Sequence, residues 1–340
     1  MRAVTLIKYG DANQAFAIRE VPQPTPADHE VLIKVSSFGL NYADVMARYG
    51  QYKDAPPLPA ILGYEVAGTI EAVGKDVTTH NVGDQVMAFT RFGGYGEYAV
   101  ADARGTAPIP TGFSMLEATA LPTQYGTAHY CAYEMVNLFE GDHVLIHAAA
   151  GGVGTALIQL AKNKGCIIYG TAGSAEKLDY LRTMGVDFPI NYRKTDFYNE
   201  IKSLRGNEGL DVIFDPIGGT NYKKSRKLLA HGGRIVSYGV SERSGKKGGI
   251  LADLKLVFDF GFLHPIMFLL NSTGTIGVNM LRIGDHQPNT LKRTLKGVVQ
   301  LSEDGVLKPH IGGTFPVDKI DEAHELLGSR NSIGKIVIEW

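Results

Sequence analysis

The sequence predicts an α/β protein with two domains, one a strand-rich, barrel-like domain and the other a doubly wound parallel sheet. The opening 120 residues hold short strand-like runs separated by Gly and Pro, with little helix. Such runs favour a compact barrel. From about residue 140, strand-like and helix-like runs alternate. This alternation implies right-handed crossovers and a parallel sheet with both faces covered.

The predicted elements of the first domain are short strands and one helix. Alternating or apolar runs bounded by turn residues indicate strands at Val4–Ile7, Phe16–Val21, Val31–Ser36, Glu65–Val73, Gln85–Phe89 and Glu97–Val100. A short helix is predicted at Tyr42–Tyr49. The chain length of 340 residues leaves room for a second core beyond this region.

The predicted elements of the second domain follow in alternation. Strands are predicted at His143–Ala148, Ile167–Thr171, Phe188–Asn191, Asp211–Phe214 and Arg234–Tyr238. Helices are predicted between them at Val153–Asn163, Ala175–Met184, Asp196–Leu204 and Asn221–Leu229. A tail of two helices, Thr290–Glu303 and Lys319–Leu327, and a last strand, Lys335–Ile338, is expected to pack back onto the first domain.

Composition excludes several functional classes. The formal net charge is −1, with 44% hydrophobic and 20% charged residues, so no general attraction to nucleic acid is expected. Two cysteines, Cys131 and Cys166, fit a reducing compartment. The first ten residues alternate like a strand, so no signal peptide is expected, and Ile250–Leu270 is too polar to be expected to span a bilayer. A cytoplasmic location is expected.

A glycine-rich turn is the strongest local signal. Ala149-Ala150-Gly151-Gly152-Val153-Gly154 directly follows an apolar run and opens a helix. A diphosphate can approach backbone N–H groups only where side chains are absent, and a helix N-terminus adds positive potential. Gly151 allows this approach and Gly154 allows close packing of helix on strand, although Ala149 replaces the first glycine of the usual fingerprint. The context predicts dinucleotide binding.

The end of the next strand indicates which dinucleotide binds. NAD sites usually carry an acidic residue about 20 residues further on, for the ribose hydroxyls. Here the segment Gly170-Thr171-Ala172-Gly173-Ser174 is neutral, and Lys177 follows. A cation without a carboxylate favours the 2′-phosphate of NADPH. An ordinary exposed helix lysine is the alternative for Lys177.

Several ordered motifs resemble one enzyme family over nearly the whole chain. They are Gly39–Asp44 with Ala47–Tyr52, Gly63–Gly68, Ala148–Gly154, Asp215–Gly219 and Leu307–Ile311. The chain resembles the zinc-free quinone oxidoreductases of the medium-chain dehydrogenase/reductase superfamily, most closely the vesicle amine transport protein-like branch. The resemblance implies a GroES-like β-barrel catalytic domain over residues 1–123 and 280–340, and a Rossmann NADP(H)-binding domain over residues 124–279.

The resemblance also implies a set of cofactor-binding residues. Thr127, Gly239 and Asn279 would line the nicotinamide cleft. The diphosphate would lie on Gly151, Gly152, Val153 and Gly154. The 2′-phosphate would be surrounded by Gly173, Ser174, Lys177, Tyr192 and Arg330.

No zinc is expected. Zinc-dependent relatives carry Gly-His-Glu where this chain has Gly63-Tyr64-Glu65, and no cysteine stands near residues 37–41 to act as the first ligand. Tyrosine does not replace a zinc-binding imidazole here, and no four-cysteine lobe for a structural zinc is present.

Without a metal, quinones and α,β-unsaturated carbonyls are the expected hydride acceptors, because conjugation spreads the developing charge. The protein then supplies hydrogen-bond donors to the carbonyl oxygen. Asn41 and Tyr52 are the candidate donors. The alternative for Asn41 is a role as a helix cap, and the alternative for Tyr52 is an exposed aromatic residue without a catalytic role. Tyr64 either faces the substrate pocket or packs in the barrel. Tyr52 or ordered water could deliver the proton.

A second class of function remains open, in which the protein binds a lipid or a membrane partner and reductase activity is secondary. Its candidate feature is Ile250–Leu270, with Phe258, Phe260, Phe262 and Phe268, preceded by Lys246-Lys247. Such a segment is more often core, a dimer contact or a pocket lid. A homodimer is expected, joined through the parallel sheets with Gly274–Val278 at the edge.

Overall fold

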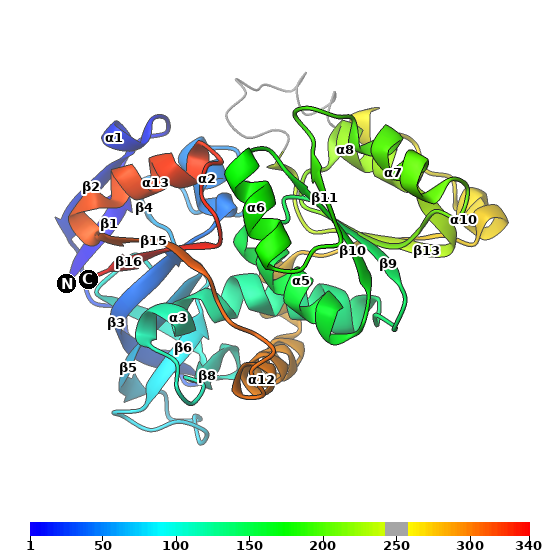
Figure 1. Ribbon diagram of the computed structural model, residues 1–340. Coiled ribbons are helices and arrows are strands. Elements are labelled where there is room, and N and C mark those ends of the chain that lie inside the picture. Colours follow the sequence, from blue (N-terminus) through cyan, green and yellow to red (C-terminus); the bar gives the residue numbers. More distant parts are fainter. Residues whose placement is uncertain (242–257) are drawn as a thin grey trace. The chain divides into compact units, whose positions relative to one another are not determined.

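The computed structural model describes residues 1–241 and 258–340. The chain forms two compact units, one of Met1–Thr127 with Met280–Trp340 and the other of Ala128–Asn279. Figure 1 labels the elements of both. The basic pair Lys246-Lys247 and the first part of Ile250–Leu270 lie outside the described residues.

The first unit contains two sheets. Its strands are β1 (Arg2–Leu6), β2 (Phe16–Glu20), β3 (Glu30–Leu40), β4 (Ala60–Ile61), β5 (Glu65–Val73), β6 (Gln85–Phe89), β7 (Tyr98–Asp102), β8 (Thr106–Pro108), β15 (Ile311–Pro316) and β16 (Lys335–Glu339). A 3-stranded sheet has the order β2-β1-β4. A 7-stranded sheet has the order β15-β16-β3-β5-β6-β8, with β7 also paired to β3.

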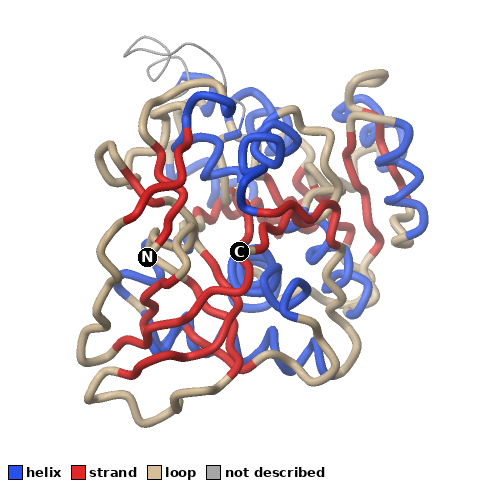
Figure 2. Tube along the Cα trace, turned by 90° about the vertical axis from the view of Figure 1, so that its left-hand side faces the viewer, coloured by secondary structure: helices blue, strands red, loops and turns tan. Residues whose placement is uncertain are grey.

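Strand β3 organises the larger sheet. It pairs antiparallel with β5, while its first half pairs with β7 and its last four residues pair with β16. Strand β16 in turn pairs parallel with β15. The sheet is therefore mixed, and the end of the chain returns to the N-terminal strands as expected (Figure 2).

Helices and helical turns complete the first unit. They are α1 (Ala12–Ala15), α2 (Tyr42–Arg48), η1 (Ala103–Gly105), α3 (Met115–Ala120), η2 (Leu121–Tyr125), α11 (Met280–His286), α12 (Pro288–Glu303), η5 (Val317–Lys319) and α13 (Ile320–Gly328). The chain crosses into the second unit through α4 (Gly126–His129), followed by η3 (Tyr130–Met135). The helical run from Met115 has no counterpart among the predicted elements. Most of its side chains from Ala118 to Ala132 are buried, so it lacks the polar face that makes a helix visible in a sequence.

The second unit is a 6-stranded sheet of parallel strands in the order β11-β10-β9-β12-β13-β14. The strands are β9 (His143–Ile146), β10 (Ile167–Ala172), β11 (Phe188–Asn191), β12 (Leu210–Asp215), β13 (Leu229–Ser237) and β14 (Gly274–Gly277). The helices are α5 (Gly152–Asn163), α6 (Ala175–Thr183), α7 (Phe197–Arg205), α8 (Gly219–Arg226) and α10 (Pro265–Asn271). They lie on both faces of the sheet (Figure 1).

This topology is the predicted doubly wound sheet. The chain builds outward from β9 to β10 and β11, then returns to the other side of β9 with β12. Strand order therefore reverses between β9 and β12, and such reversals create ligand sites at the carboxyl ends of the strands. The expected α/β fold, with a GroES-like unit and a Rossmann unit, is confirmed.

One predicted helix is wrong at its end. The expected helix Asn221–Leu229 stops at Arg226, and Leu229 already begins β13. The apolar pair Leu228-Leu229 extends the helical pattern in the sequence, but Leu228 is buried in the core of the sheet. The pair Gly232-Gly233 lies inside β13. Because glycine pairs usually indicate a turn, the sequence pattern places the start of this strand too late.

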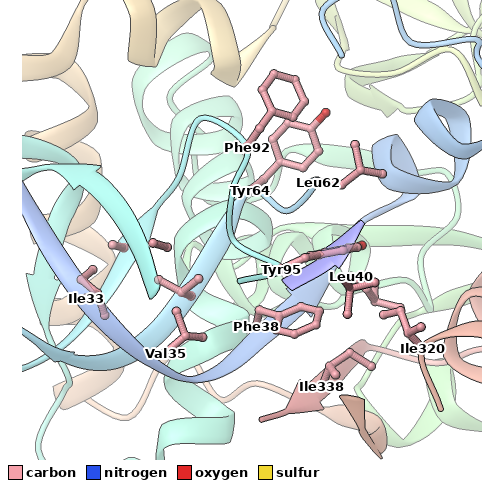
Figure 3. Packing of buried hydrophobic residues seen from close by; sticks show 14 of the residues in the cluster. Ile33, Val35, Phe38, Leu40, Leu62, Tyr64, Phe92, Tyr95, Ile320 and Ile338 are labelled. Carbon is pink, nitrogen blue, oxygen red and sulfur yellow. The ribbon is translucent and has the colours of Figure 1, made fainter. Parts of the chain in front are cut away.

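Each unit has its own hydrophobic core. In the first unit, apolar side chains from β1, β3, β5, β6 and β16 pack with aromatic rings (Figure 3). In the second, residues of β9, β12 and β13 pack against Phe197 and Ile201 of α7 and Tyr222 of α8.

Candidate active site

The carboxyl ends of the parallel strands gather most of the predicted cofactor residues. The glycine turn follows β9, Gly173 follows β10, and Tyr192 follows β11. Gly239 and Asn279 each come two residues after the last residue of their strands, β13 and β14. Because the strands are parallel, these residues all lie at the carboxyl ends of the strands. The strand order of this sheet reverses between β9 and β12.

The glycine turn places bare backbone at the start of helix α5. Gly151 is the N-cap residue, no side chain caps the helix, and Gly152 and Val153 form its first turn. A Cβ on Gly154 would lie 2.6 Å from the carbonyl oxygens of both Ala148 and Ala149. Only glycine therefore permits this approach, and the N–H groups of the first turn, which no side chain caps, form a site suited to a diphosphate.

A second polar group lies at the ends of β10 and β11. Ser174 caps helix α6 by accepting a hydrogen bond from the Lys177 N–H at 3.3 Å. A Cβ on Gly173 would lie 2.6 Å from the Tyr192 hydroxyl, so that hydroxyl lies over the glycine. Burial lowers the pKa of Lys177, and the positive charge of Arg193 lowers it further. Two cations thus share this corner, which suits a phosphate.

Arg193 was missed by the sequence reasoning. It directly follows Tyr192, and its Nε would lie 3.2 Å from a Cβ on Gly173. The signal was available, since a second cation stood beside a residue already assigned to the 2′-phosphate. The other two assigned residues, Thr127 and Arg330, belong to the first unit. There Arg330 donates a hydrogen bond to the Tyr42 hydroxyl at 3.1 Å.

In the first unit, Asn41 stands at the centre of a buried polar network. It is the N-cap residue of α2, and its N–H donates to the Asp44 carboxylate at 2.8 Å. Its side-chain Nδ2 donates to Glu65 Oε1 at 2.7 Å, and its Oδ1 accepts from Lys335 Nζ at 3.0 Å. Asn41 therefore occupies the N-cap position of α2, and its side chain also hydrogen-bonds to Glu65 and Lys335.

Glu65 connects this network to η2. Its Oε1 forms an ion pair with Lys335, and its Oε2 accepts a hydrogen bond from the Thr123 N–H at 2.8 Å. The Thr127 hydroxyl donates to the Thr123 carbonyl at 2.6 Å. One carboxylate thus connects Asn41 with the turn that carries Thr127.

Burial sets the electrostatics of this network. Glu65 and Asp44 have no exposed surface, and Lys335 has 1%. Burial raises the pKa of Asp44 to about 7. Burial also lowers the pKa of Lys335, an effect that the neighbouring Glu65 opposes.

Tyr64 packs in the barrel core, as the packing alternative expects. Its ring is 6.0 Å from that of Tyr52 in an edge-on arrangement and 5.1 Å from that of Phe92 (Figure 3). Burial raises the pKa of both tyrosines, and the charge of Asp44 raises both further. Both phenols are therefore neutral at physiological pH and retain a proton to donate.

Over residues 1–241 and 258–340, no cluster of three or more His, Cys, Asp or Glu side chains has the arrangement of a metal site. In the same part of the chain, no helix is long and apolar enough to cross a membrane.

Glu65 and Lys335 were missed as site residues. Glu65 stood inside the quoted motif Gly63-Tyr64-Glu65, but only the tyrosine was interpreted. Lys335 opens the buried strand β16 (Lys335–Glu339), whose first four residues are all buried. A lysine in such a strand is a signal, because lysine is almost never fully buried unless paired.

Comparisons with known proteins agree with this architecture. Residues 27–111 match the alcohol dehydrogenase GroES-like domain, and residues 152–261 match the zinc-binding dehydrogenase domain. The chain is 34% identical to the synaptic vesicle membrane protein VAT-1 homolog of zebrafish, over 99% of this chain and 69% of that protein. It is 31% identical to human quinone oxidoreductase, over 99% of this chain and 97% of that protein.

A solved structure of Escherichia coli quinone oxidoreductase complexed with NADPH superimposes with a TM-score of 0.85 and 26% identity, covering 100% of both chains. The sequence matches span both units, and the motifs at Asn41, Glu65 and the glycine turn lie in the matched regions. The chain therefore belongs to the medium-chain dehydrogenase/reductase superfamily, in the branch that contains the VAT-1-like proteins and the quinone oxidoreductases.

Proposed function

We propose that this protein is an NADPH-dependent oxidoreductase that reduces quinones or α,β-unsaturated carbonyls without a metal. The observation that carries the proposal is the edge of the parallel sheet, where an uncapped glycine turn and a pair of cations, Lys177 and Arg193, follow neighbouring strands. A diphosphate and a 2′-phosphate are the chemical groups that suit these two positions.

The residues favour NADPH over NADH. Strand β10 ends in Thr171 and Ala172, so no carboxylate stands there to bind free ribose hydroxyls or to repel a phosphate. Tyr192 adds a neutral hydroxyl beside Gly173. The E. coli relative, which was solved with NADPH, supports the same choice.

In the first unit, Asn41 and Tyr52 are the proposed donors to the acceptor's carbonyl oxygen. When bound, NADPH supplies the hydride. The Asn41 amide has one N–H directed at Glu65 and a second N–H to offer. Tyr52 is partly exposed and neutral, so its hydroxyl can donate a hydrogen bond and, in the proposed reaction, a proton. Conjugated acceptors need only such donors, because they spread the negative charge themselves.

The test is NADPH oxidation by the purified protein with a panel of quinones, enones and alkenals, and with matched saturated ketones as controls. We expect turnover with the conjugated acceptors, little with the saturated ketones, and weaker activity when NADH replaces NADPH. Absence of turnover with every conjugated acceptor, by protein that binds NADPH, would reject the proposal.

We also propose that two copies of the chain associate through β14 and α10. Strand β14 ends the strand order of the sheet, so one of its sides pairs with no described strand. Beside it in sequence, α10 has no buried residue, and Leu269, Leu270 and Phe262 are 73%, 70% and 84% exposed. An edge strand next to an apolar surface suits symmetric pairing with its copy.

The alternative occupant of this surface is a lipid, and that reading is favoured by the same exposed residues. Two measurements separate the two readings. The dimer predicts twice the chain mass at micromolar concentration in light scattering, reduced to the monomer mass in Leu269→Asp/Leu270→Asp. The lipid reading predicts a monomer that co-sediments with phospholipid vesicles, and this result would overturn the dimer.

A further inference from the structure

We propose that Lys335 and Glu65 are positioning residues that orient the Asn41 amide toward the acceptor, and that Glu65 also holds the turn η2. The proposal rests on the function proposed above, in which the Asn41 side chain donates a hydrogen bond to the acceptor.

The ion pair lies where hydrophobic packing would be the ordinary choice. Glu65 is 0% and Lys335 1% exposed, within a unit that has a core of apolar side chains. Removing two charges from water is costly, and replacing such a pair with apolar residues is often neutral or stabilising. Stability alone therefore does not explain the pair, whereas orientation of a neighbouring group does.

Gly39 provides the room for this pair. A Cβ at that position would lie 2.3 Å from Lys335 Cε and 2.6 Å from Glu65 Oε1. Gly39 is in β3, directly across from β16, where residue pairing puts it opposite Val337. Three segments, β3, β5 and β16, thus each contribute to one arrangement of charge.

The pair determines which way the Asn41 amide points. Lys335 has only donors and an ionised Glu65 has only acceptors. The amide oxygen therefore faces Lys335 Nζ at 3.0 Å, and the amide nitrogen faces Glu65 Oε1 at 2.7 Å. A flipped amide would place donor against donor and acceptor against acceptor. With the first N–H fixed, the direction of the second N–H is fixed as well.

The same carboxylate also holds η2. Glu65 Oε2 accepts from the Thr123 N–H at 2.8 Å, and Thr123 accepts the hydroxyl hydrogen bond of Thr127. Glu65 therefore aligns Asn41 on one oxygen and the Thr123–Thr127 turn on the other. Loss of the Glu65 carboxylate affects both contacts, whereas loss of Lys335 removes the donor to the Asn41 amide oxygen and leaves the Thr123 contact in place.

The first test is a double-mutant cycle on turnover, with Lys335→Met, Glu65→Gln and Asn41→Ala singly and in pairs. Lys335→Met should lower kcat about tenfold or more, the typical size of one lost charged hydrogen bond, with NADPH Kd unchanged. In the Asn41→Ala background, Lys335→Met should have no further effect, because its action passes through Asn41. Lys319→Met removes an exposed lysine of the same unit and is the matched control. Equal, additive losses in both backgrounds would overturn the proposal.

The second test needs no turnover. The side-chain NH₂ resonances of Asn41, identified by their loss in Asn41→Asp, should show two well-separated proton shifts and slow exchange in the wild type. Glu65→Gln and Lys335→Met should bring the shifts together and speed exchange, while Lys319→Met leaves them unchanged. Unchanged resonances in both site variants would overturn the proposal. If no acceptor is reduced but these shifts respond, the proposed reaction fails and the positioning role stands.

Discussion

The two units build their polar sites in opposite ways. In the second unit, the site is mostly backbone, an uncapped helix start and glycines whose neighbours leave no space for a Cβ. In the first unit, the site is made of side chains, with Asn41, Glu65 and Lys335 hydrogen-bonded while buried. The glycine turn itself carries no titrating side chain and tolerates no bulk at Gly154, although Lys177 and Arg193 bring charge to the same unit. The first unit's network depends on the charges of Glu65 and Lys335, for which Gly39 leaves room.

The largest expected effect follows from charge in the first unit. Burial raises the pKa of Asp44 from 3.8 to about 7, so the folded state holds a proton that the unfolded state loses. Protonated Asp44 therefore stabilises the folded state. This stabilisation is fully present below about pH 4 and is lost as the pH rises through about 7, which lowers the free energy of unfolding by ~4 kcal/mol. Asp44→Asn should flatten this decline. Fluorescence of Trp340, the chain's single tryptophan and part of the first unit, reports the unfolding.

The control for this measurement is Asp76→Asn, which removes an exposed carboxylate of the same unit. Its unfolding free energy should follow the wild-type pH curve. If Asp44→Asn follows that curve too, charge does not distinguish the first unit's site.

The next effect tests intolerance of bulk in the second unit. Gly154→Ala places a methyl group 2.6 Å from two backbone carbonyl oxygens, and overpacking of this kind costs up to ~3 kcal/mol. We expect NADPH affinity, measured by titration, to fall about a hundredfold. Gly277→Ala is the matched control, since a Cβ there meets nothing within 4 Å. Equal affinities in the two variants would contradict a backbone-built site.

A smaller effect is expected from the proposed donors. Removing one preorganised donor to a developing oxyanion costs about 2.7–4 kcal/mol in the strongest cases, and an electrophilic quinone needs less help. We expect Asn41→Ala and Tyr52→Phe each to lower turnover by about ten- to a hundredfold, with NADPH binding nearly unchanged. Wild-type turnover in both variants would remove these residues from the reaction.

A still smaller effect is expected on the preference for NADPH over NADH when Lys177 is replaced. Lys177→Ala removes one charged contact, worth about 1.5 kcal/mol at the low end, and should weaken NADPH binding about tenfold. NADH lacks the phosphate and should bind as before. Four dissociation constants, for both cofactors with both proteins, decide the matter. Equal losses for the two cofactors would place Lys177 away from the 2′-phosphate.

Removal of metal ions is expected to have no effect on turnover. By family resemblance, Tyr64 stands where zinc-dependent relatives carry a histidine ligand, and no cysteine lies near residues 37–41. Elemental analysis should find no stoichiometric zinc, and chelators should leave turnover intact. One zinc per chain, lost together with activity, would reverse this conclusion.

Sequence patterns are informative where the residues concerned lie close together in the chain. The glycine turn, the neutral end of β10 and Lys177 lie within about 30 residues, and Glu65–Val73 and Gln85–Phe89 were predicted to the residue. The first unit's network was missed because its members are far apart, with Asn41 and Lys335 separated by 294 positions. No periodicity links such residues, and only the pairing of β16 with β3 brings them together. The run Met115–Met135 was missed because apolar helices have no polar face to mark them.

The pairing of β16 with β3 also sets an order of events during synthesis. A ribosome must translate the whole second unit before it reaches the strand that carries Lys335. Until then, Glu65 lacks its cation and the edge of β3 lacks its neighbour. Domains generally fold as units during translation, so the second unit can fold while the first waits open. The strand that completes the sheet therefore also delivers the last charge of the site.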